Sequence, residues 1–205
     1  MKKIIAFLLF VIVLSSCGND RSAVKTETAE QARKRDSTKK AIYNAIKKAD
    51  VTRVTNPDKK LLAKMTKEVD EFKGILFYTS KKYKKGYSNE IELYIVQTGR
   101  AYSMRAIFQY TAPDWLFMDS IELICDGKKR MITLSNVKRD NDGGDVYEYE
   151  DLLVDGNLKS ILELIIYSKE VKMRYVGKDY IHDRVIKDSE KNKMKEVFEV
   201  LFKKE

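Results

Sequence analysis

Nucleophilic chemistry in this 205-residue chain would have to use a very small set of side chains. The sequence holds two cysteines, Cys17 and Cys125, and a single histidine, His182. A Cys–His pair would require Cys125 and His182 to meet in the fold, because the thiolate needs an adjacent base. The segment Tyr-Ile-His-Asp-Arg around His182 is more typical of a surface or hydrogen-bonded histidine. We therefore favour a structural role for both residues, with Cys125 as a small buried apolar side chain.

Carboxylates offer a second chemistry, because seven acidic residues fall within residues 140–155. Carboxylates can act as general acids and bases, so a carboxylate-dependent, hydrolase-like enzyme is kept as an alternative function. An EF-hand calcium loop needs acids at positions 1, 3 and 5, glycine at 6 and glutamate at 12. Counted from Asp140, the match fails at positions 5, 6 and 12. We expect a Gly-Gly hairpin turn with solvated acids, and weak calcium binding at Asp140, Asp142 and Asp145 is the alternative.

Other catalytic and cofactor signatures are missing from the sequence. Zinc sites need three or four Cys, His or carboxylate ligands, and these residue types are largely absent. The chain has no P-loop, no dinucleotide-binding fingerprint and no Gly-x-Ser-x-Gly motif. We expect no cofactor and no bound metal, and a non-enzymatic function is favoured.

A lysine-rich segment is the strongest candidate for a contact surface. Its candidate residues are Lys81, Lys82, Tyr83, Lys84, Lys85 and Tyr87. Four like charges around two aromatic rings can hold a polyanion, a lipid headgroup or an acidic envelope protein. The favoured interpretation is plainer: a solvated hairpin tip whose lysines protect a strand edge from aggregation.

The positive charge of the chain is unevenly distributed. The formal net charge is +9, but residues 71–205 hold 24 Lys and Arg against 23 Asp and Glu. Residues 18–70 hold 14 basic residues against eight acidic ones. A nearly neutral C-terminal part argues against a nucleic-acid partner and fits a basic tether near an anionic membrane.

The N-terminus predicts export and lipid anchoring. Met-Lys-Lys is followed by an apolar run at 4–14, which is too short to span a bilayer and fits a signal peptide at 1–16. The next residues, Leu14-Ser-Ser-Cys17, resemble the lipobox of bacterial lipoprotein signal peptides. The resemblance implies cleavage before Cys17 and lipidation of its thiol. We therefore expect a membrane-anchored lipoprotein on the exported side of a bacterial cell envelope, with residues 17–56 as a basic, flexible tether and no partner left for Cys125.

Residues 57–205 are expected to form one globular domain. Apolar residues at helical spacing predict a helix over 57–69, and alternating segments predict strands at 74–79, 90–97 and 101–111. The stretch 110–127 contains the only tryptophan, Trp115, which we expect to be buried at the entry of an apolar strand over 116–125. The dipeptide Asp126-Gly127 then predicts a tight hairpin to a return strand over 129–134.

The remainder predicts further strands at 146–150 and 171–176, with a loop at 140–145. A broad apolar stripe predicts a well-buried helix over 157–169, and Met194, Val197, Phe198 and Leu201 predict a C-terminal amphipathic helix. The expected fold class is α+β, on a mainly antiparallel β-sheet with one late core helix and this C-terminal helix. A β-sandwich with appended helices is the alternative.

The order of features from about Leu62 to Phe202 resembles a family of small exported bacterial domains, many of them lipoproteins. The matching residues are Tyr94-Ile95, Tyr110, Asp114-Trp115-Leu116-Phe117, Asp126-Gly127, Glu148-Tyr149, Asp151, Arg174, Gly177, Tyr180, Asp183-Arg184 and Glu190-Lys191. The resemblance implies an exported domain with these boundaries and brings no activity with it.

Taken together, these features predict an envelope-anchored binding or structural module that contacts the membrane through its lipid. An envelope protein or a polyanion is the expected partner. The carboxylate-dependent enzyme and an inhibitor or exclusion factor acting on a neighbouring envelope protein are the alternatives. An enzyme should show converging carboxylates in a concave site.

Overall fold

The computed structural model describes residues 53–82, 88–142 and 144–203. The chain divides into two compact units, Met1–Lys48 and Ala49–Glu205, and every described residue belongs to the second unit. The predicted signal peptide, Cys17 and most of the predicted tether lie outside the described residues. Within the second unit, the backbone of Val54 forms a β-bridge with Tyr102. The folded structure therefore begins slightly before the predicted domain start at residue 57.

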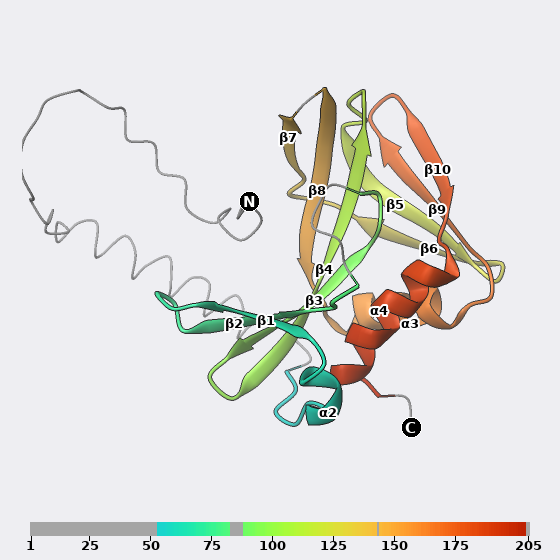
Figure 1. Ribbon diagram of the computed structural model, residues 1–205. Coiled ribbons are helices and arrows are strands. Elements are labelled where there is room, and N and C mark those ends of the chain that lie inside the picture. The colour runs from blue at the N-terminus through green and yellow to red at the C-terminus, as the bar shows by residue number, and fades with distance from the viewer. Residues whose placement is uncertain (1–52, 83–87, 143, 204–205) are drawn as a thin grey trace, which may run out of the picture. The chain divides into compact units, whose positions relative to one another are not determined.

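Six strands form one antiparallel sheet in the order β1-β2-β3-β4-β8-β7 (Figure 1). Their bounds are Thr66–Asp70 (β1), Ile75–Thr79 (β2), Glu92–Thr98 (β3), Ala101–Ala112 (β4), Lys138–Asp142 (β7) and Asp145–Leu153 (β8). The central strands β3 and β4 alternate in burial, with Leu93, Ile95, Met104, Ala106 and Phe108 fully or almost fully buried. One face of this sheet is therefore a core face, as period-two alternation requires.

Four strands form a second antiparallel sheet in the order β10-β9-β5-β6. Their bounds are Met118–Cys125 (β5), Lys128–Thr133 (β6), Val171–Gly177 (β9) and Ile181–Val185 (β10). Asp126 and Gly127 join β5 to β6 with φ angles of 46° and 80°. Positive φ at both central residues is the geometry of a type I′ hairpin turn, so the predicted Asp-Gly hairpin is confirmed.

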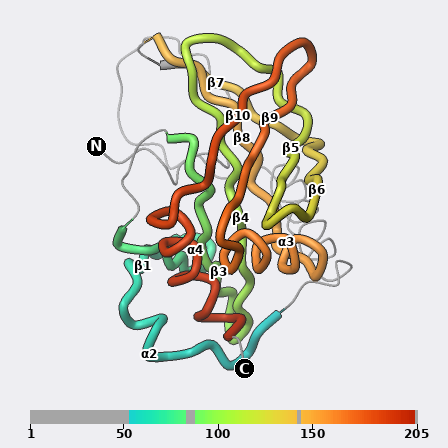
Figure 2. Tube along the Cα trace, turned by 90° about the vertical axis from the view of Figure 1, so that its right-hand side faces the viewer, coloured from blue at the N-terminus to red at the C-terminus, as the bar shows by residue number. Residues whose placement is uncertain are grey.

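The two sheets pack face to face in the part of the domain away from the helices (Figures 1 and 2). Tyr175 of β9 crosses between them, and its hydroxyl lies 2.8 Å from the carbonyl oxygens of both Asn89 and Gln109. Its ring contacts Tyr110 of β4 at a centroid distance of 5.7 Å. The fold is thus α+β on mainly antiparallel sheet, as predicted, and its two sheets are layered as in the sandwich alternative.

Helices cover the other part of the core. These are the short α2 (Lys59–Leu62), α3 (Gly156–Tyr167) and α4 (Asp188–Leu201), and α3 and α4 lie side by side in both views. Asp155 caps α3 by accepting a hydrogen bond from the Leu158 amide at 2.7 Å. Lys191 of α4 donates to the carbonyls of Ser168 and Lys169, both at 2.9 Å, just after α3 ends. Both late helices were predicted and are confirmed.

The predicted helix over 57–69 is wrong. The helix α2 ends at Leu62, and Thr66–Asp70 forms the edge strand β1, which pairs with β2. Val69, which the helical pattern placed on the domain, is 54% exposed. Pairing with β2 supplies backbone hydrogen bonds that outweigh the weak helical preference of such a short segment.

The predicted Gly-Gly hairpin turn within residues 140–145 is confirmed, but the loop predicted over the whole of this segment is too long, because the flanking strands extend into it. Residues 138–142 form β7, and Asp142 pairs with Asp145 across a two-residue connection to β8. Gly144 adopts a φ of 102°, which favours glycine. The acids of this segment therefore stand on a β-hairpin and not on an open loop.

None of the helices in the described ranges is long and apolar enough to cross a membrane.

A candidate binding site at the aromatic end

Three chain connections meet at the end of the domain remote from the helices (Figures 1 and 2). They are the β4–β5, β7–β8 and β9–β10 connections. With the adjoining strand residues they comprise residues 113–119, 138–145 and 177–183, which we call the aromatic end. Strand register brings them together, because Ala112 pairs with Val146 and Met118 pairs with Gly177. Segments distant in sequence therefore form one surface.

Phe117 is the unusual residue of this surface. Its backbone has a φ of 55°, in the left-handed region that bulky L-residues rarely adopt, and its side chain is 51% exposed. The ring of half-buried Trp115 lies 6.2 Å from that of Phe117, centroid to centroid. Tyr180 and Ile181 add exposed fractions of 70% and 56%. The aromatic end therefore displays several large side chains on tight turns.

The exposure of Trp115 departs from the expectation that it enters the core. Leu116 takes the core position instead and is 2% exposed, while Trp115 is half-buried and Phe117 is exposed. Strand β5 begins only at Met118. The alternation of the Asp-Trp-Leu-Phe-Met segment, with Leu116 and Met118 inward, is the signal that would have indicated this arrangement.

A buried carboxylate holds the unusual backbone in place. Glu148 of β8 has no exposed surface, and its two carboxylate oxygens accept hydrogen bonds from the consecutive amides of Leu116, Phe117 and Met118 at 2.6–2.7 Å. Arg139 of β7 donates to the same carboxylate at 3.1 Å. The Arg139 guanidinium also lies 5.5 Å from the Phe117 ring centroid, a cation–π contact. Four hydrogen bonds compensate for burying the charge of Glu148.

Close packing fixes the neighbouring turn against this segment. A Cβ added to Gly177 would lie 1.9 Å from the carbonyl oxygen of Leu116, so only glycine fits. Next to this turn, the rings of buried Tyr110 and Tyr175 and of exposed His182 form a cluster with centroid distances of 5.5–6.2 Å. The aromatic end is therefore packed against buried aromatic side chains of both sheets.

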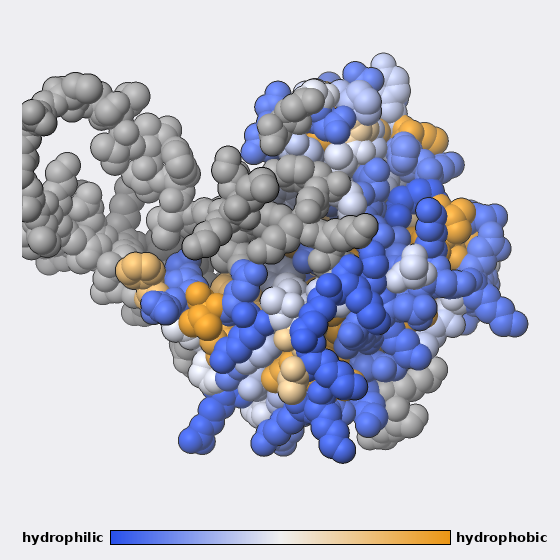
Figure 3. Space-filling model, in the orientation of Figure 1, coloured by the Kyte–Doolittle hydropathy of each residue, from blue (hydrophilic) through white to orange (hydrophobic). Residues whose placement is uncertain are grey.

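The surface colouring shows how exposed apolar side chains are distributed over one face of the domain. In Figure 3 the described surface is mostly hydrophilic, and hydrophobic side chains appear as separate small patches, not as one broad apolar face. The exposed large hydrophobic residues outside the aromatic end are Val69, Phe72, Ile124, Met131 and Val185. Scattered exposed residues of this kind are ordinary, whereas aromatic residues gathered on buried support need a reason.

Four of the seven acids in residues 140–155 serve the fold. Glu148 holds the 116–118 amides, Glu150 accepts from the amides of Ser135 and Asn136, and Asp155 caps α3. Asp151 accepts from Tyr94 Oη at 2.7 Å and from Arg105 Nε at 2.9 Å. These assignments leave fewer carboxylates for the hydrolase-like alternative than the sequence count suggested.

The remaining acids include the predicted calcium ligands. Asp142 and Asp145 are paired across the β7–β8 turn, and Asp140 stands two residues before Asp142 on β7. The Asp140 carboxylate accepts from the Asn141 amide at 2.8 Å. Among the described side chains, no group of three or more His, Cys, Asp or Glu is placed to hold a metal ion. Calcium binding at this hairpin stays a prediction.

The lysine-rich segment lies mostly outside the described residues. Of its candidates, Tyr83, Lys84, Lys85 and Tyr87 fall in the undescribed gap, while Lys81 and Lys82 are described and exposed. Lys82 Nζ forms an ion pair with Glu196 of α4 at 3.1 Å. At least one lysine therefore has a contact within the domain.

Cys125 and His182 do not meet. Cys125 pairs with Val171 at one end of β9 and His182 pairs with Tyr175, four residues further along. Four residues of strand correspond to about 13 Å. A Cys–His mechanism between them is therefore excluded by this arrangement.

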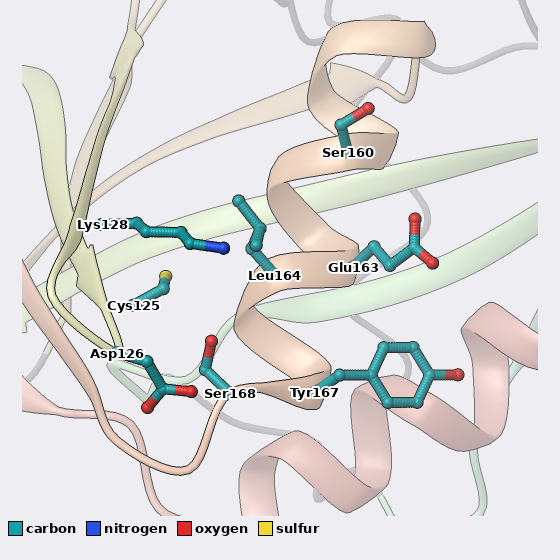
Figure 4. A pocket seen from close by; sticks show the side chains of 8 residues that line it. All are labelled: Cys125, Asp126, Lys128, Ser160, Glu163, Leu164, Tyr167 and Ser168. Carbon is teal, nitrogen blue, oxygen red and sulfur yellow. The ribbon is translucent and has the colours of Figure 1, made fainter.

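Cys125 instead lines a pocket of about 340 Å³ between α3 and the β5–β6 hairpin (Figure 4). Burial raises the pKa of the Cys125 thiol, which disfavours the nucleophilic thiolate. Asp126 accepts from the amides of Lys169 and Glu170, and Tyr167 donates to Glu199. Much of the polar lining is thus committed to the fold, and Cys125 is a buried residue as predicted.

A second polar cluster lies on the face of the six-stranded sheet turned away from the core. Ile107 pairs with Glu92 on one side and with Asp151 on the other, so the two acids share one row of this face. Burial, and secondarily the charge of Asp151, raises the pKa of Glu92. Burial likewise raises the pKa of Tyr94. The row places a carboxyl with a raised pKa near a carboxylate held by Arg105.

The raised pKa of Glu92 predicts a pH-dependent effect on stability. Folding raises the pKa of Glu92, so the contribution of this group to stability is fully present below its ordinary pKa of 4.5 and is lost as pH rises through the higher folded-state pKa. Glu92→Gln should therefore be more stable than the wild type at neutral pH and equally stable well below pH 4.5. Urea unfolding across a pH series measures this, with Glu122→Gln on the other sheet as control. A stability difference that does not change with pH would contradict the prediction.

Comparison of the chain with protein-family models, with curated protein sequences and with solved structures found no match. The resemblance to small exported bacterial domains therefore stays a prediction, and the function must be argued from the site itself.

Proposed function

We propose that this chain is an exported bacterial lipoprotein, held in the cell envelope by lipid on Cys17, whose folded domain is a non-enzymatic binding module. Its recognition surface is the aromatic end. One observation carries the proposal: the buried carboxylate of Glu148 holds Phe117 in a left-handed conformation that exposes its ring. Backbone strain of this kind costs about 1–3 kcal/mol and clusters at functional sites.

The construction of the surface favours binding over catalysis. Exposed aromatic rings on rigid turns supply contact area at low entropic cost, because little order has to be gained on association. Aromatic residues are also the side chains most enriched in the energetically dominant parts of protein interfaces. The polar groups next to Phe117, Glu148 and Arg139, are already hydrogen-bonded to the protein.

The place where the described chain enters the domain is compatible with a binding role for the aromatic end. Val54, near the start of the described chain, pairs with Tyr102 at the beginning of β4, whereas the aromatic end follows Ala112 at the end of β4. Ten strand residues correspond to roughly 30 Å. The described chain thus enters the domain at the end opposite the aromatic surface.

Site-specific cross-linking in cells tests the recognition surface. A photoreactive phenylalanine analogue placed at Tyr180 should cross-link one dominant envelope partner. The same analogue at Met131, which is 60% exposed on the distant edge strand β6, should not. Equal adducts at both positions, or adducts only at Met131, would remove the aromatic end from the proposal. The identity of the adduct also decides whether the module inhibits or excludes a neighbouring envelope protein.

The lipid anchor has its own prediction. Cys17→Ala should abolish lipidation and move the protein from the membrane fraction to the soluble exported fraction, or block processing before residue 17. The motivation is the Leu14-Ser-Ser-Cys17 motif. Membrane fractionation with mass spectrometry of the N-terminal peptide measures both effects. Unchanged membrane retention, together with an unmodified Cys17 in the wild type, would show that the anchor is absent.

A carboxylate-dependent enzyme is the second candidate, supported by the row that holds Glu92 and Asp151. Acid and base roles need two titratable groups whose environments separate their pKa values. The Asp151 carboxylate is already hydrogen-bonded by Tyr94 and Arg105, so it is committed to a local network. The binding module is therefore the better-supported function.

A further inference from the structure

We infer that the partner of the aromatic end is a protein that presents a cationic segment, with arginine or lysine side chains that stack on the exposed rings. This inference rests on the proposed function and names the chemistry of its partner. It is carried by the charge of the aromatic end, which is opposite to that of the chain as a whole.

The three segments of the aromatic end contain seven acidic residues and three basic ones, although the chain has a formal net charge of +9. One of the bases, Arg139, is held by Glu148 and the Phe117 ring. The exposed acids that form no ion pair among the described residues are Asp114, Asp119, Asp140, Asp145 and Asp179. The surface therefore combines unneutralised carboxylates with aromatic rings.

This combination selects cations. A guanidinium or ammonium group gains from the face of an aromatic ring and from a nearby carboxylate at the same time. The domain already shows the first contact, since the Arg139 guanidinium lies over the Phe117 ring. A cation from a partner can reach the exposed parts of the Phe117 and Tyr180 side chains and of half-buried Trp115.

Anionic partners are disfavoured for the same reason. An anionic lipid surface or a polyanion would meet like charge at the aromatic end, which costs free energy and slows association. Such partners fit the lysine-rich segment around Lys81 and Lys82 instead. A neutral glycan would stack on the aromatic rings without needing the carboxylates. The dependence of binding on the acidic residues therefore distinguishes a neutral glycan from a cationic protein.

Fluorescence of Trp115 provides the test, because it is the only tryptophan of the chain and lies within the site. A protein of residues 18–205 is titrated with hexa-arginine, hexaglutamate or an N-acetylglucosamine tetramer. Hexa-arginine should change the Trp115 emission saturably, and added salt should weaken the effect. Asp114→Asn/Asp179→Asn should reduce the apparent affinity by about tenfold, as expected for losing two exposed charge contacts.

The matched control is Glu71→Gln/Glu170→Gln, which removes the same charge from exposed acids outside the aromatic end. An equal loss of affinity in both double variants would show non-specific attraction and overturn the inference. A response to the N-acetylglucosamine tetramer without one to hexa-arginine would also overturn it, while leaving a binding function at this surface. No response to hexa-arginine likewise refutes the cationic partner. Cross-linking at Tyr180 decides separately whether the surface binds at all.

Discussion

Replacing Glu148 by alanine is expected to lower the free energy of unfolding by about 3–5 kcal/mol. The substitution removes the acceptor of three consecutive amides, two of them buried, and of Arg139 in one step. The amides of Leu116 and Met118 would be left without a partner in the interior. Chemical denaturation, monitored by far-UV circular dichroism, measures the loss.

Glu150→Ala is the matched control for this prediction. Glu150 lies two residues further along β8 and is 6% exposed, but it accepts only the amides of Ser135 and Asn136. Its loss should therefore be clearly smaller than that of Glu148. If Glu148→Ala costs less than about 1 kcal/mol, the carboxylate does not hold the 116–118 backbone, and the structural basis of the aromatic end is wrong.

Gly177→Ala should also destabilise the domain, by roughly 3 kcal/mol, the upper part of the usual range for overpacking. The added methyl group would overlap the Leu116 carbonyl, at 1.9 Å, and the Leu116 side chain, at 2.7 Å. Because the obstacle includes backbone, the β9–β10 turn has to move away from the 113–117 segment. The emission of Trp115 should shift in the same variant, since its surroundings change.

Gly156→Ala is the control for the glycine prediction. Nothing lies within 4 Å of a Cβ built there, and the residue begins α3. Alanine at a helical position is favourable by about 0.5–1 kcal/mol relative to glycine, so this variant should be at least as stable as the wild type. Equal stability of both variants would mean that the close approach of Gly177 to Leu116 is not maintained in solution.

Much of the architecture follows from local sequence patterns. The alternation of Ile91, Leu93 and Ile95 predicts β3, and the apolar stripe over 157–169 predicts α3, because both patterns report one buried face. Asp126-Gly127 predicts its hairpin because few residues tolerate positive φ. The helix predicted over 57–69 is wrong because residues 66–70 pair with β2. No local sequence pattern reports that long-range pairing.

The candidate site was predictable only in part. The composition of the stretch around Trp115 marks it as important, but the Trp115 ring was predicted to lie in the core. That prediction assumed that every large apolar residue of the stretch is buried. Glu148 was included among the seven acids of residues 140–155 and among the residues of the resemblance, but no pattern indicated that it would be buried, since a glutamate between two tyrosines looks like a solvated strand residue. The Glu148 carboxylate accepts hydrogen bonds from three amides about 30 residues away only because β8 lies against the start of β5. Such long-range polar contacts leave no periodic signal.

Phe117→Gly is the most direct test of the central claim that the aromatic end is the recognition surface. Glycine adopts positive φ without strain, which offsets its larger unfolded-state entropy and the loss of a half-exposed ring, so stability should stay within about 1 kcal/mol of the wild type. The measurement is the amount of the Tyr180-cross-linked partner that co-isolates from native membranes, quantified by mass spectrometry, with Met131→Ala as control. The account predicts that Phe117→Gly loses most of this partner while Met131→Ala retains it. Full retention of the partner by a stably folded Phe117→Gly protein would contradict the account.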